Sequence, residues 1–198
     1  FKGPVTVTIT APKLLPAAAD ISDRLQATGI AMEIKLDTTT QPSDYATIEI
    51  GYADSDIRGL NEADLVLARY DEGSRKWVPL QSTAYPGQNK VIGRTLHFSL
   101  FQVMLLRPLS GFAQARIYPN PFYPATRNRV TFDGLPAAAS VKLFTLQGEL
   151  VWEGTADNLG AVDWYGVNKS GRQVASGIYI AHLKSGSSEK TLKLSVVK

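Results

Sequence analysis

Two histidines, His97 and His182, carry the side chains in this chain best suited to ligating a transition metal. A zinc site needs three or four nitrogen, sulfur or carboxylate ligands that converge on one point. The two histidines are expected to lie in different domains, and the chain of 198 residues has no cysteine, which excludes thiolate ligands and disulfide bonds. We therefore expect no metal and no cofactor, and we interpret both histidines as surface or edge residues.

Four carboxylates close together in the sequence offer the oxygen ligands that calcium prefers. They are Asp54, Asp56, Glu62 and Asp64. Their spacing matches no known calcium loop, so a solvated turn is the simpler interpretation.

Two other kinds of chemistry depend on serine and on aromatic residues. Serine, histidine and aspartate are all present, but no serine is flanked by the glycines of a nucleophile elbow, so the sequence predicts no hydrolase triad. Exposed aromatic rings could form a platform for carbohydrate, although in small β-sandwiches such rings more commonly fill the core. The candidates are Trp77, Tyr118, Trp152, Trp164 and Tyr179.

Composition places the chain among globular proteins. Apolar residues make up 44% of it, which is enough to bury a core. The net charge is +3 and the basic residues are scattered, whereas phosphate binding needs them on one face, so we expect no nucleic-acid partner. No apolar run approaches the roughly 18 residues of a membrane helix, so no membrane span is predicted.

The elements that must position these residues are β-strands. In the first half of the chain, stretches of alternating apolar and polar residues are separated by turn-rich segments, as in half-buried antiparallel strands. Val5, Val7 and Ile9 are expected on a core face, an irregular connection is expected over residues 16–29, and residues 100–106 are expected to be buried on both faces. The predicted strands cover residues 5–10, 30–36, 46–52, 65–70, 77–80, 91–95 and 98–106.

A segment rich in proline, serine and glycine, residues 107–111, interrupts the strand pattern and has the composition of a linker. We place the linker at residues 107–114, between an N-terminal domain of residues 1–106 and a C-terminal domain of residues 115–198. The predicted fold class is all-β, with two tandem antiparallel β-sandwiches joined by this short linker.

The C-terminal domain alternates strands with turn signals. The run Tyr118-Pro119-Asn120-Pro121-Phe122 must end a strand, because proline fixes φ and removes a backbone donor. Gln147-Gly148 is predicted as a two-residue hairpin turn in which glycine takes a positive φ. Gly177 is predicted to bend the chain into a strand at residues 178–183, and residues 190–197 form the last strand.

Residues 117–198 resemble the immunoglobulin-like C-terminal modules of secreted bacterial proteins, a group that includes the Ig-like domain of the flagellar hook-cap protein and the C-terminal sorting domain of type IX secretion. The resemblance implies an Ig-like sandwich that serves in export, in attachment or as a stabilising cap. The family usually has an acidic residue where this chain has Tyr165. The matching residues are Asn120, Pro121, Gly148, Trp164, Gly166, Asn168, Gly171, Gly177, Tyr179 and Lys198.

Four stretches of the N-terminal domain, residues 48–52, 65–71, 77–80 and 97–101, resemble a β-sandwich of bacterial surface proteins that is distantly similar to the ZU-type domains of netrin receptors and ankyrins. Some of those relatives cut themselves at a His-Phe-Ser sequence, which here is His97-Phe98-Ser99.

The resemblance therefore implies one candidate reaction. Ser99 would attack the carbonyl carbon of Phe98 with His97 as proton acceptor, and water would hydrolyse the resulting ester. Such cleavage needs a strained peptide at Phe98, because an unstrained amide is a poor electrophile. In the alternative interpretation, Phe98 and Phe101 are core residues and Ser99 bonds to the backbone.

The sequence thus predicts a non-catalytic structural or surface-display module at the C-terminus of an exported bacterial protein, located outside the cell or on its surface. The partners that this implies are other protein modules, secretion or surface-attachment machinery, and further copies of the chain. Two alternatives stay open: a self-cleaving domain at Phe98-Ser99 and a carbohydrate-binding appendage of an enzyme.

Overall fold

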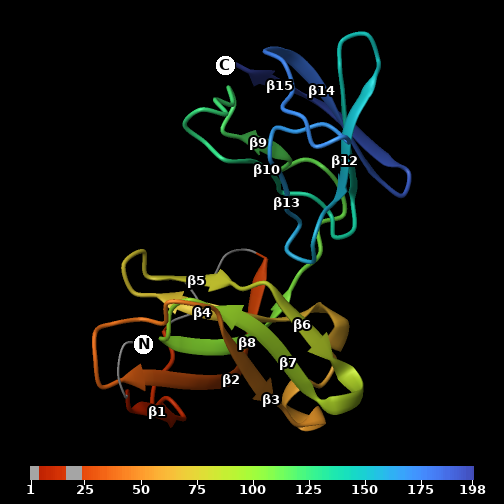
Figure 1. The fold of residues 1–198 in the computed structure, drawn as a ribbon. Coiled ribbons are helices and arrows are strands. Elements are labelled where there is room, and N and C mark those ends of the chain that lie inside the picture. Colours follow the sequence, from red (N-terminus) through yellow and green to blue (C-terminus); the bar gives the residue numbers. More distant parts are fainter. Residues whose placement is uncertain (1–4, 17–23) are drawn as a thin grey trace. The chain divides into compact units, whose positions relative to one another are not determined.

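The computed structural model describes residues 5–16 and 24–198. These residues form β-strands and short 3₁₀ turns, so the predicted all-β class is confirmed. The chain divides into two compact units, Phe1–Arg107 and Pro108–Lys198, each built from two antiparallel sheets; in Figure 1 they run from red to green and from green to blue. Within the described ranges no helix has the length and apolar character needed to cross a membrane.

The first unit combines a five-stranded sheet, in the order β1-β2-β8-β4-β5, with a three-stranded sheet, in the order β3-β7-β6. Four connections cross from one sheet to the other, which is what makes the unit a sandwich. The strands are β1 (Val7–Thr10), β2 (Leu25–Leu36), β3 (Ala46–Gly51), β4 (Leu65–Asp71), β5 (Lys76–Pro79), β6 (Ser82–Tyr85), β7 (Lys90–Thr95) and β8 (Leu100–Leu106), and the 3₁₀ turns are η2 (Asp54–Ile57), η3 (Glu62–Asp64) and η4 (Pro86–Gln88).

Strand β8 lies at the centre of the five-stranded sheet, paired with β2 on one side and β4 on the other. Phe101 and Val103 belong to the core cluster of the unit. Gln102 and Met104 are also buried, and by strand alternation they lie on the opposite face. The expectation that residues 100–106 are buried on both faces is confirmed.

The prediction of a core face for β1 is wrong. Val7 and Ile9 are 46% and 60% exposed. Strand β1 is the outermost strand of its sheet and contributes no residue to the core cluster. Alternation correctly indicates a strand here, but it does not reveal that neither face is covered.

Two strand starts and one whole strand of this unit also differ clearly from prediction. Strand β2 begins at Leu25, inside the predicted connection over residues 16–29, of which residues 17–23 lie outside the described part of the chain. Strand β6 is absent from the sequence prediction, and β8 begins at Leu100. Residues 97–99 therefore form a turn and not the start of a strand.

The second unit has the strand arrangement of an immunoglobulin-like sandwich. Its three-stranded sheet has the order β9-β10-β13 and its four-stranded sheet the order β12-β11-β14-β15. With the strands lettered A, B, C, C′, E, F and G from β9 to β15, these sheets are A-B-E and C′-C-F-G. The strands are β9 (Arg116–Tyr118), β10 (Val130–Asp133), β11 (Ser140–Phe144), β12 (Leu150–Thr155), β13 (Val162–Trp164), β14 (Gly177–Ser185) and β15 (Ser188–Val196).

Trp164 lies at the centre of the second core and is fully buried. Its ring centroid lies 6.1 Å from that of Phe122, 6.4 Å from that of Trp152 and 6.2 Å from that of Tyr179. The indole N–H donates to the carbonyl oxygen of Val167 at 2.8 Å, so this large side chain is buried without leaving a polar group unpaired.

Tyr179 fixes the corner that leads into β14. Its hydroxyl donates to the carbonyl oxygen of Ala175 at 2.8 Å, and a tyrosine bonded to backbone a few residues upstream is a hallmark of immunoglobulin-like domains. Burial raises the pKa of this phenol, although the bond to the carbonyl acts in the opposite direction.

Two glycines with nearly the same backbone conformation show how tightly the second core is packed. Gly166 has φ +73° and Gly171 has φ +74°. A Cβ atom added to Gly166 would lie 2.8 Å from Cε1 of Phe122, whereas one added to Gly171 would meet nothing within 4 Å.

We predict that Gly171→Ala lowers the free energy of unfolding by about 1–2 kcal/mol, the cost of a left-handed alanine. Gly166→Ala should lower it by roughly a further 1–3 kcal/mol, because the added methyl group overpacks the core against Phe122. Urea unfolding followed by tryptophan fluorescence measures both. Equal losses for the two variants would contradict close packing of Gly166 on Phe122.

Candidate functional site

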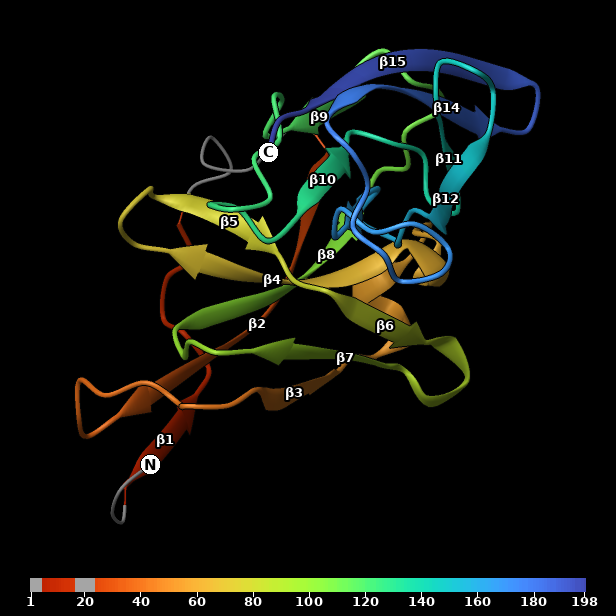
Figure 2. The ribbon, with the colours of Figure 1, turned by 45° about the horizontal axis from the view of Figure 1, so that its top comes forward.

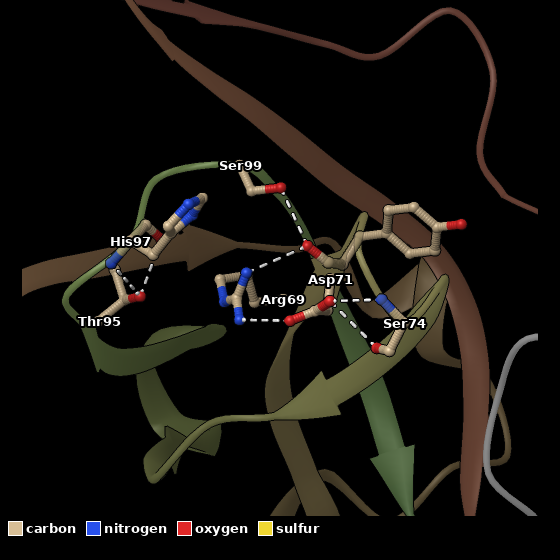
Figure 3. Close-up of polar contacts among 7 residues, drawn as sticks. Arg69, Asp71, Ser74, Thr95, His97 and Ser99 are labelled. Carbon is tan, nitrogen blue, oxygen red and sulfur yellow. Dashed lines mark hydrogen bonds and ion pairs between the residues drawn. The ribbon is translucent and has the colours of Figure 1, made fainter. Parts of the chain in front are cut away.

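The turn between β7 and β8 contains His97, Phe98 and Ser99, and hydrogen bonds hold its backbone (Figure 3). The Thr95 hydroxyl accepts from the His97 N–H at 3.1 Å and donates to the His97 carbonyl at 2.9 Å. The Phe98 N–H donates to Oε1 of Gln41 at 2.8 Å. None of the three turn residues has a positive φ.

The Ser99 hydroxyl donates to the carbonyl oxygen of Tyr70 at 3.0 Å (Figure 3). Among the described residues, no hydrogen bond joins the His97 ring to this hydroxyl. To attack the carbonyl carbon of Phe98, the hydroxyl would have to leave Tyr70 and transfer its proton to a base. The Phe98 side chain packs against the core of the first unit. This geometry corresponds to the structural interpretation of the motif, and self-cleavage stays a hypothesis.

A polar cluster on the β4–β5 hairpin borders the turn. Oδ1 of Asp71 accepts from the Ser74 N–H at 2.8 Å and from the Ser74 hydroxyl at 3.1 Å, and Oδ2 lies 3.3 Å from Nη2 of Arg69 (Figure 3). These bonds favour the carboxylate, so the pKa of Asp71 lies below its ordinary value, chiefly because of the Ser74 backbone N–H. Arg69 also donates to the Tyr70 carbonyl at 3.4 Å, so the same oxygen accepts from Arg69 and Ser99.

Two open grooves flank the turn, and Arg69 and His97 line both of them. The first has a volume of about 510 Å³ and carries charges of both signs, including Glu33, Lys35 and Asp71. Because both cations and carboxylates line this groove, its charge alone does not select a ligand.

The second groove, of about 460 Å³, is lined by Arg69, Arg94 and His97 and by no carboxylate. The Arg94 guanidinium lies 5.1 Å from the ring centroid of Tyr45, which is 56% exposed. An arginine stacked on an aromatic ring still presents its N–H groups outward, so this groove suits an anionic group more than a cationic one.

The metal-ligating residues singled out by type do not gather. His97 belongs to the first unit, and His182 of the second unit lies 3.4 Å from a carboxylate oxygen of Glu189. Within residues 5–16 and 24–198, no group of three or more histidine, aspartate or glutamate side chains could hold a metal ion.

The four carboxylates considered for calcium accept hydrogen bonds from backbone or side-chain donors of the first unit. Oδ2 of Asp56 accepts from the Ala53 N–H at 3.0 Å, and Oδ2 of Asp64 accepts from the amide of Asn61 at 2.8 Å. Glu62 accepts from the Tyr52 hydroxyl at 2.8 Å, and burial together with this bond raises the pKa of Tyr52 to about 12. Asp54 accepts from the amide of Asn89.

The aromatic platform considered for carbohydrate is contradicted by burial. Trp77, Trp164 and Tyr179 are at most 6% exposed, and Trp152 packs against the second core. Tyr118 is 46% exposed and stands alone among the five, with the Arg116 guanidinium 5.5 Å from its ring centroid. Trp152, Trp164 and Tyr179 pack in the second core and Trp77 is buried in the first unit, as is usual for aromatic residues in small sandwiches.

The Asn120 side chain binds the edge of β15. Its Nδ2 donates to the Lys193 carbonyl at 2.9 Å, and its Oδ1 accepts from the Ser195 N–H at 3.0 Å. Phe122 continues the contact, because its N–H donates to the Ser195 carbonyl at 2.8 Å and its carbonyl accepts from the Val197 N–H at 2.9 Å. The segment from Asn120 to Phe122, named the edge clasp here, closes this stretch of sheet edge.

Asn168 organises the loop that follows β13. Its side-chain oxygen accepts from the N–H groups of Ser170 and Arg172, both at 3.0 Å. Its carbonyl accepts from the Gly171 N–H at 2.9 Å. The motif residues Asn168 and Gly171 therefore meet in one turn.

Gly148 takes the predicted positive φ, at +87°. The hairpin loop is longer than the predicted two-residue turn, because the closing bond runs from the Thr145 N–H to the Glu149 carbonyl at 2.9 Å and leaves residues 146–148 between them. A glycine at the end of such a loop is typical of a hairpin with a bulge.

The remaining motif residues lie at element ends. Pro121 follows a cis peptide bond inside the edge clasp, and Gly177 is the first residue of β14. The Lys198 N–H donates to the Ser176 hydroxyl at 3.0 Å. Tyr165, at the position where the family usually has an acidic residue, is 58% exposed.

Sequence reasoning missed two arrangements. The cluster of Arg69, Asp71 and Ser74 has a local signal, because an aspartate followed three residues later by serine around a glycine is typical of a side-chain-closed turn. The edge clasp has none, because Asn120 and Lys193 are 73 residues apart.

No family model and no curated protein matches the chain. Among solved structures, PorZ of Porphyromonas gingivalis, described as an essential bacterial surface component of the type IX secretion system, is 28% identical over 49% of this chain, with a TM-score of 0.42. Dimeric latent PorU of the same organism aligns with 99% of this chain at 13% identity and a TM-score of 0.31. The chain spans 14% of the PorZ chain and 20% of the PorU chain, and both TM-scores are too low to establish a shared fold.

We predict that Ser74→Ala raises the pKa of Asp71 toward its ordinary value, because it removes the hydroxyl donor and leaves the backbone N–H. The low pKa of Asp71 favours the folded state above the ordinary carboxyl pKa, and that contribution disappears as the pH falls through the folded-state pKa. Carboxyl-detected NMR titration measures the shift. An unchanged Asp71 pKa in Ser74→Ala would contradict a role for the hydroxyl.

Proposed function

We propose that this chain is a non-catalytic module of an exported bacterial protein, acting in sorting, surface attachment or assembly. The second unit is the part proposed to address secretion or attachment machinery, because it combines an Ig-like sandwich with the residue pattern that resembles sorting and attachment modules. The first unit is proposed as a structural companion whose partners are other protein modules.

The main support for the proposal is that polar side chains of the motif bind the backbone of their own unit and not a ligand site. Asn120, Asn168 and Tyr179 all hydrogen-bond to backbone groups of their own unit. Side chains used in this way maintain a closed sandwich and are not available to activate a substrate. The outer surface of the unit is then the part left for a partner.

The geometry of residues 97–99 also supports a non-catalytic role. The Ser99 hydroxyl is a donor to a backbone carbonyl, and the neighbouring N–H groups have side-chain acceptors. A serine nucleophile instead needs a base within hydrogen-bond reach.

A secretion assay tests the proposal. The chain is fused to the C-terminus of a reporter that carries a leader for the inner membrane, in a bacterium with a type IX secretion system. We expect the reporter to reach the cell surface or the medium with residues 1–198 fused, and to stay in the periplasm when residues 1–107 are fused alone. A reporter that stays in the periplasm with both fusions would overturn the role in sorting.

Lys198→Ala provides a matched variant for that assay. Within the described part of the chain no hydrogen bond or ion pair uses the Lys198 side chain, and the backbone contact to Ser176 is kept. Thermal unfolding should therefore be unchanged, so any loss of export reports recognition of this side chain and not a loss of fold.

Intact mass spectrometry tests whether the chain cleaves itself between Phe98 and Ser99. We predict one species with the mass of the full chain, before and after prolonged incubation, for the native chain and for Ser99→Ala alike. Two fragments that break between Phe98 and Ser99, sum to the chain plus one water and vanish in Ser99→Ala would instead establish self-cleavage.

A further inference from the structure

Strand β1 is the outermost strand of its sheet, and it lacks the protection that β5, β12 and β15 carry. An exposed edge offers unpaired N–H and C=O groups to another strand, and proteins commonly blunt it with charge, proline or a covering segment. Strand β5 contains Lys76 and Pro79, β15 has the edge clasp, and the Val151 carbonyl of β12 accepts from the Lys169 N–H at 3.0 Å. Strand β1, the outermost strand of its sheet in Figure 2, contains no charged residue and no proline, and no described segment hydrogen-bonds to its outer side.

The register with β2 determines which backbone groups of β1 face outward. Thr6 accepts from the Asp37 N–H at 3.2 Å, and the register continues through Thr8 opposite Lys35. In an antiparallel pair the bonded residues alternate, so Thr6, Thr8 and Thr10 bond to β2. The N–H and C=O groups of Val7 and Ile9 therefore point away from the sheet, and no described residue bonds to them.

The side chains of this edge favour association. Val7 is 46% exposed and Ile9 is 60% exposed, and both lie on one face of the strand. Residues 5–11 contain no charged side chain, and their sequence is bounded by Pro4 and Pro12. An uncharged, β-branched strand of this kind is a ready template for pairing.

The same segment is complementary to itself. Thr8 is the midpoint between Pro4 and Pro12, so a two-fold axis through Thr8 aligns residues 5–11 of one copy with residues 11–5 of another. In this alignment Val7 lies opposite Ile9 of the second copy, and both belong to the set whose backbone groups point outward. An isologous contact needs this self-complementarity, and no like charges oppose each other across the axis.

We propose that two copies of this chain associate by antiparallel pairing of their β1 strands, with Thr8 opposite Thr8 of the second copy. The contact joins the two five-stranded sheets into one continuous sheet and brings the exposed Val7 and Ile9 side chains together across the axis. This inference deepens the assembly role proposed above by naming its surface and its partner. It is independent of sorting, which the secretion assay tests separately.

Single cysteines test the register, because the chain has no cysteine of its own. Residues opposite each other in a non-hydrogen-bonded antiparallel pair have Cα atoms about 4.5 Å apart, within the range for a disulfide. Thr8→Cys should therefore give a covalent dimer under mild oxidation. Thr6→Cys and Thr10→Cys should each give little dimer alone, because the offset of four residues separates the thiols by about 13 Å. An equimolar mixture of these two variants should cross-link.

Ile9→Pro separates pairing from folding. It removes an N–H that faces outward and leaves the bonds between β1 and β2 in place, as proline is tolerated on an edge strand. We expect circular dichroism to match that of the native chain, light scattering to show the loss of the dimer, and cross-linking of Thr8→Cys to be lost in the double variant.

Two outcomes would overturn the proposal. One is cross-linking of the three single-cysteine variants at equal rates, which would indicate random collision. The other is a native chain that stays monomeric in light scattering at high concentration, which would leave the open edge to a strand of another protein.

Discussion

Sheet edges impose the constraint on which the rest of this structure depends. A sheet pairs its interior backbone groups but leaves a row of N–H and C=O groups along each outer strand. In the second unit the Asn120 amide and the Phe122 backbone occupy that row on β15, and Lys169 binds the outer side of β12. In the first unit the corresponding groups of β1 stay free. Edges β12 and β15 of the second unit therefore have backbone partners on their outer side, whereas edge β1 of the first unit has none among the described residues.

The burial of β8 accounts for the hydrogen bonds that hold residues 97–99, the turn that precedes this strand. The strand is covered on both faces, and the chain enters it directly from the other sheet. A crossing of this kind must be anchored, because its buried polar groups need partners. Thr95, Gln41 and Tyr70 supply those partners for residues 97–99. The motif residues 97–99 are thus hydrogen-bonded where the chain enters the central strand, with Ser99 donating to Tyr70 and Phe98 packed against the core.

The sequence predicts the parts of this fold that alternation controls and misses those that depend on distant neighbours. Period-two patterns located β3, β7, β8 and β15 because each has one apolar face or two. Strand β6 has a serine, a threonine and a terminal tyrosine around a single alanine, so no apolar pattern marks it. The exposure of β1 was not predictable, because alternation distinguishes two faces without saying whether either is covered. Among the candidate site residues, the positive φ of Gly148 followed from turn chemistry, whereas the edge clasp joins residues 73 apart and left no local trace.

The hydrogen bonds that the motif side chains make within their own unit limit which residues can contact a partner. A side chain that satisfies a backbone group of its own unit loses that bond if it turns toward a partner, and an unpaired buried polar group costs about 1–3 kcal/mol. The indole of the buried Trp164 is held in this way, whereas Asn120 and Asn168 make their bonds to backbone groups nearer the surface. Exposed side chains carry no such cost. Tyr165 is 58% exposed beside the fully buried Trp164, so a change of residue at this position alters the surface without disturbing the core. A partner of this unit is therefore expected to contact exposed positions such as Tyr165 and not the side chains that bond to the unit's own backbone.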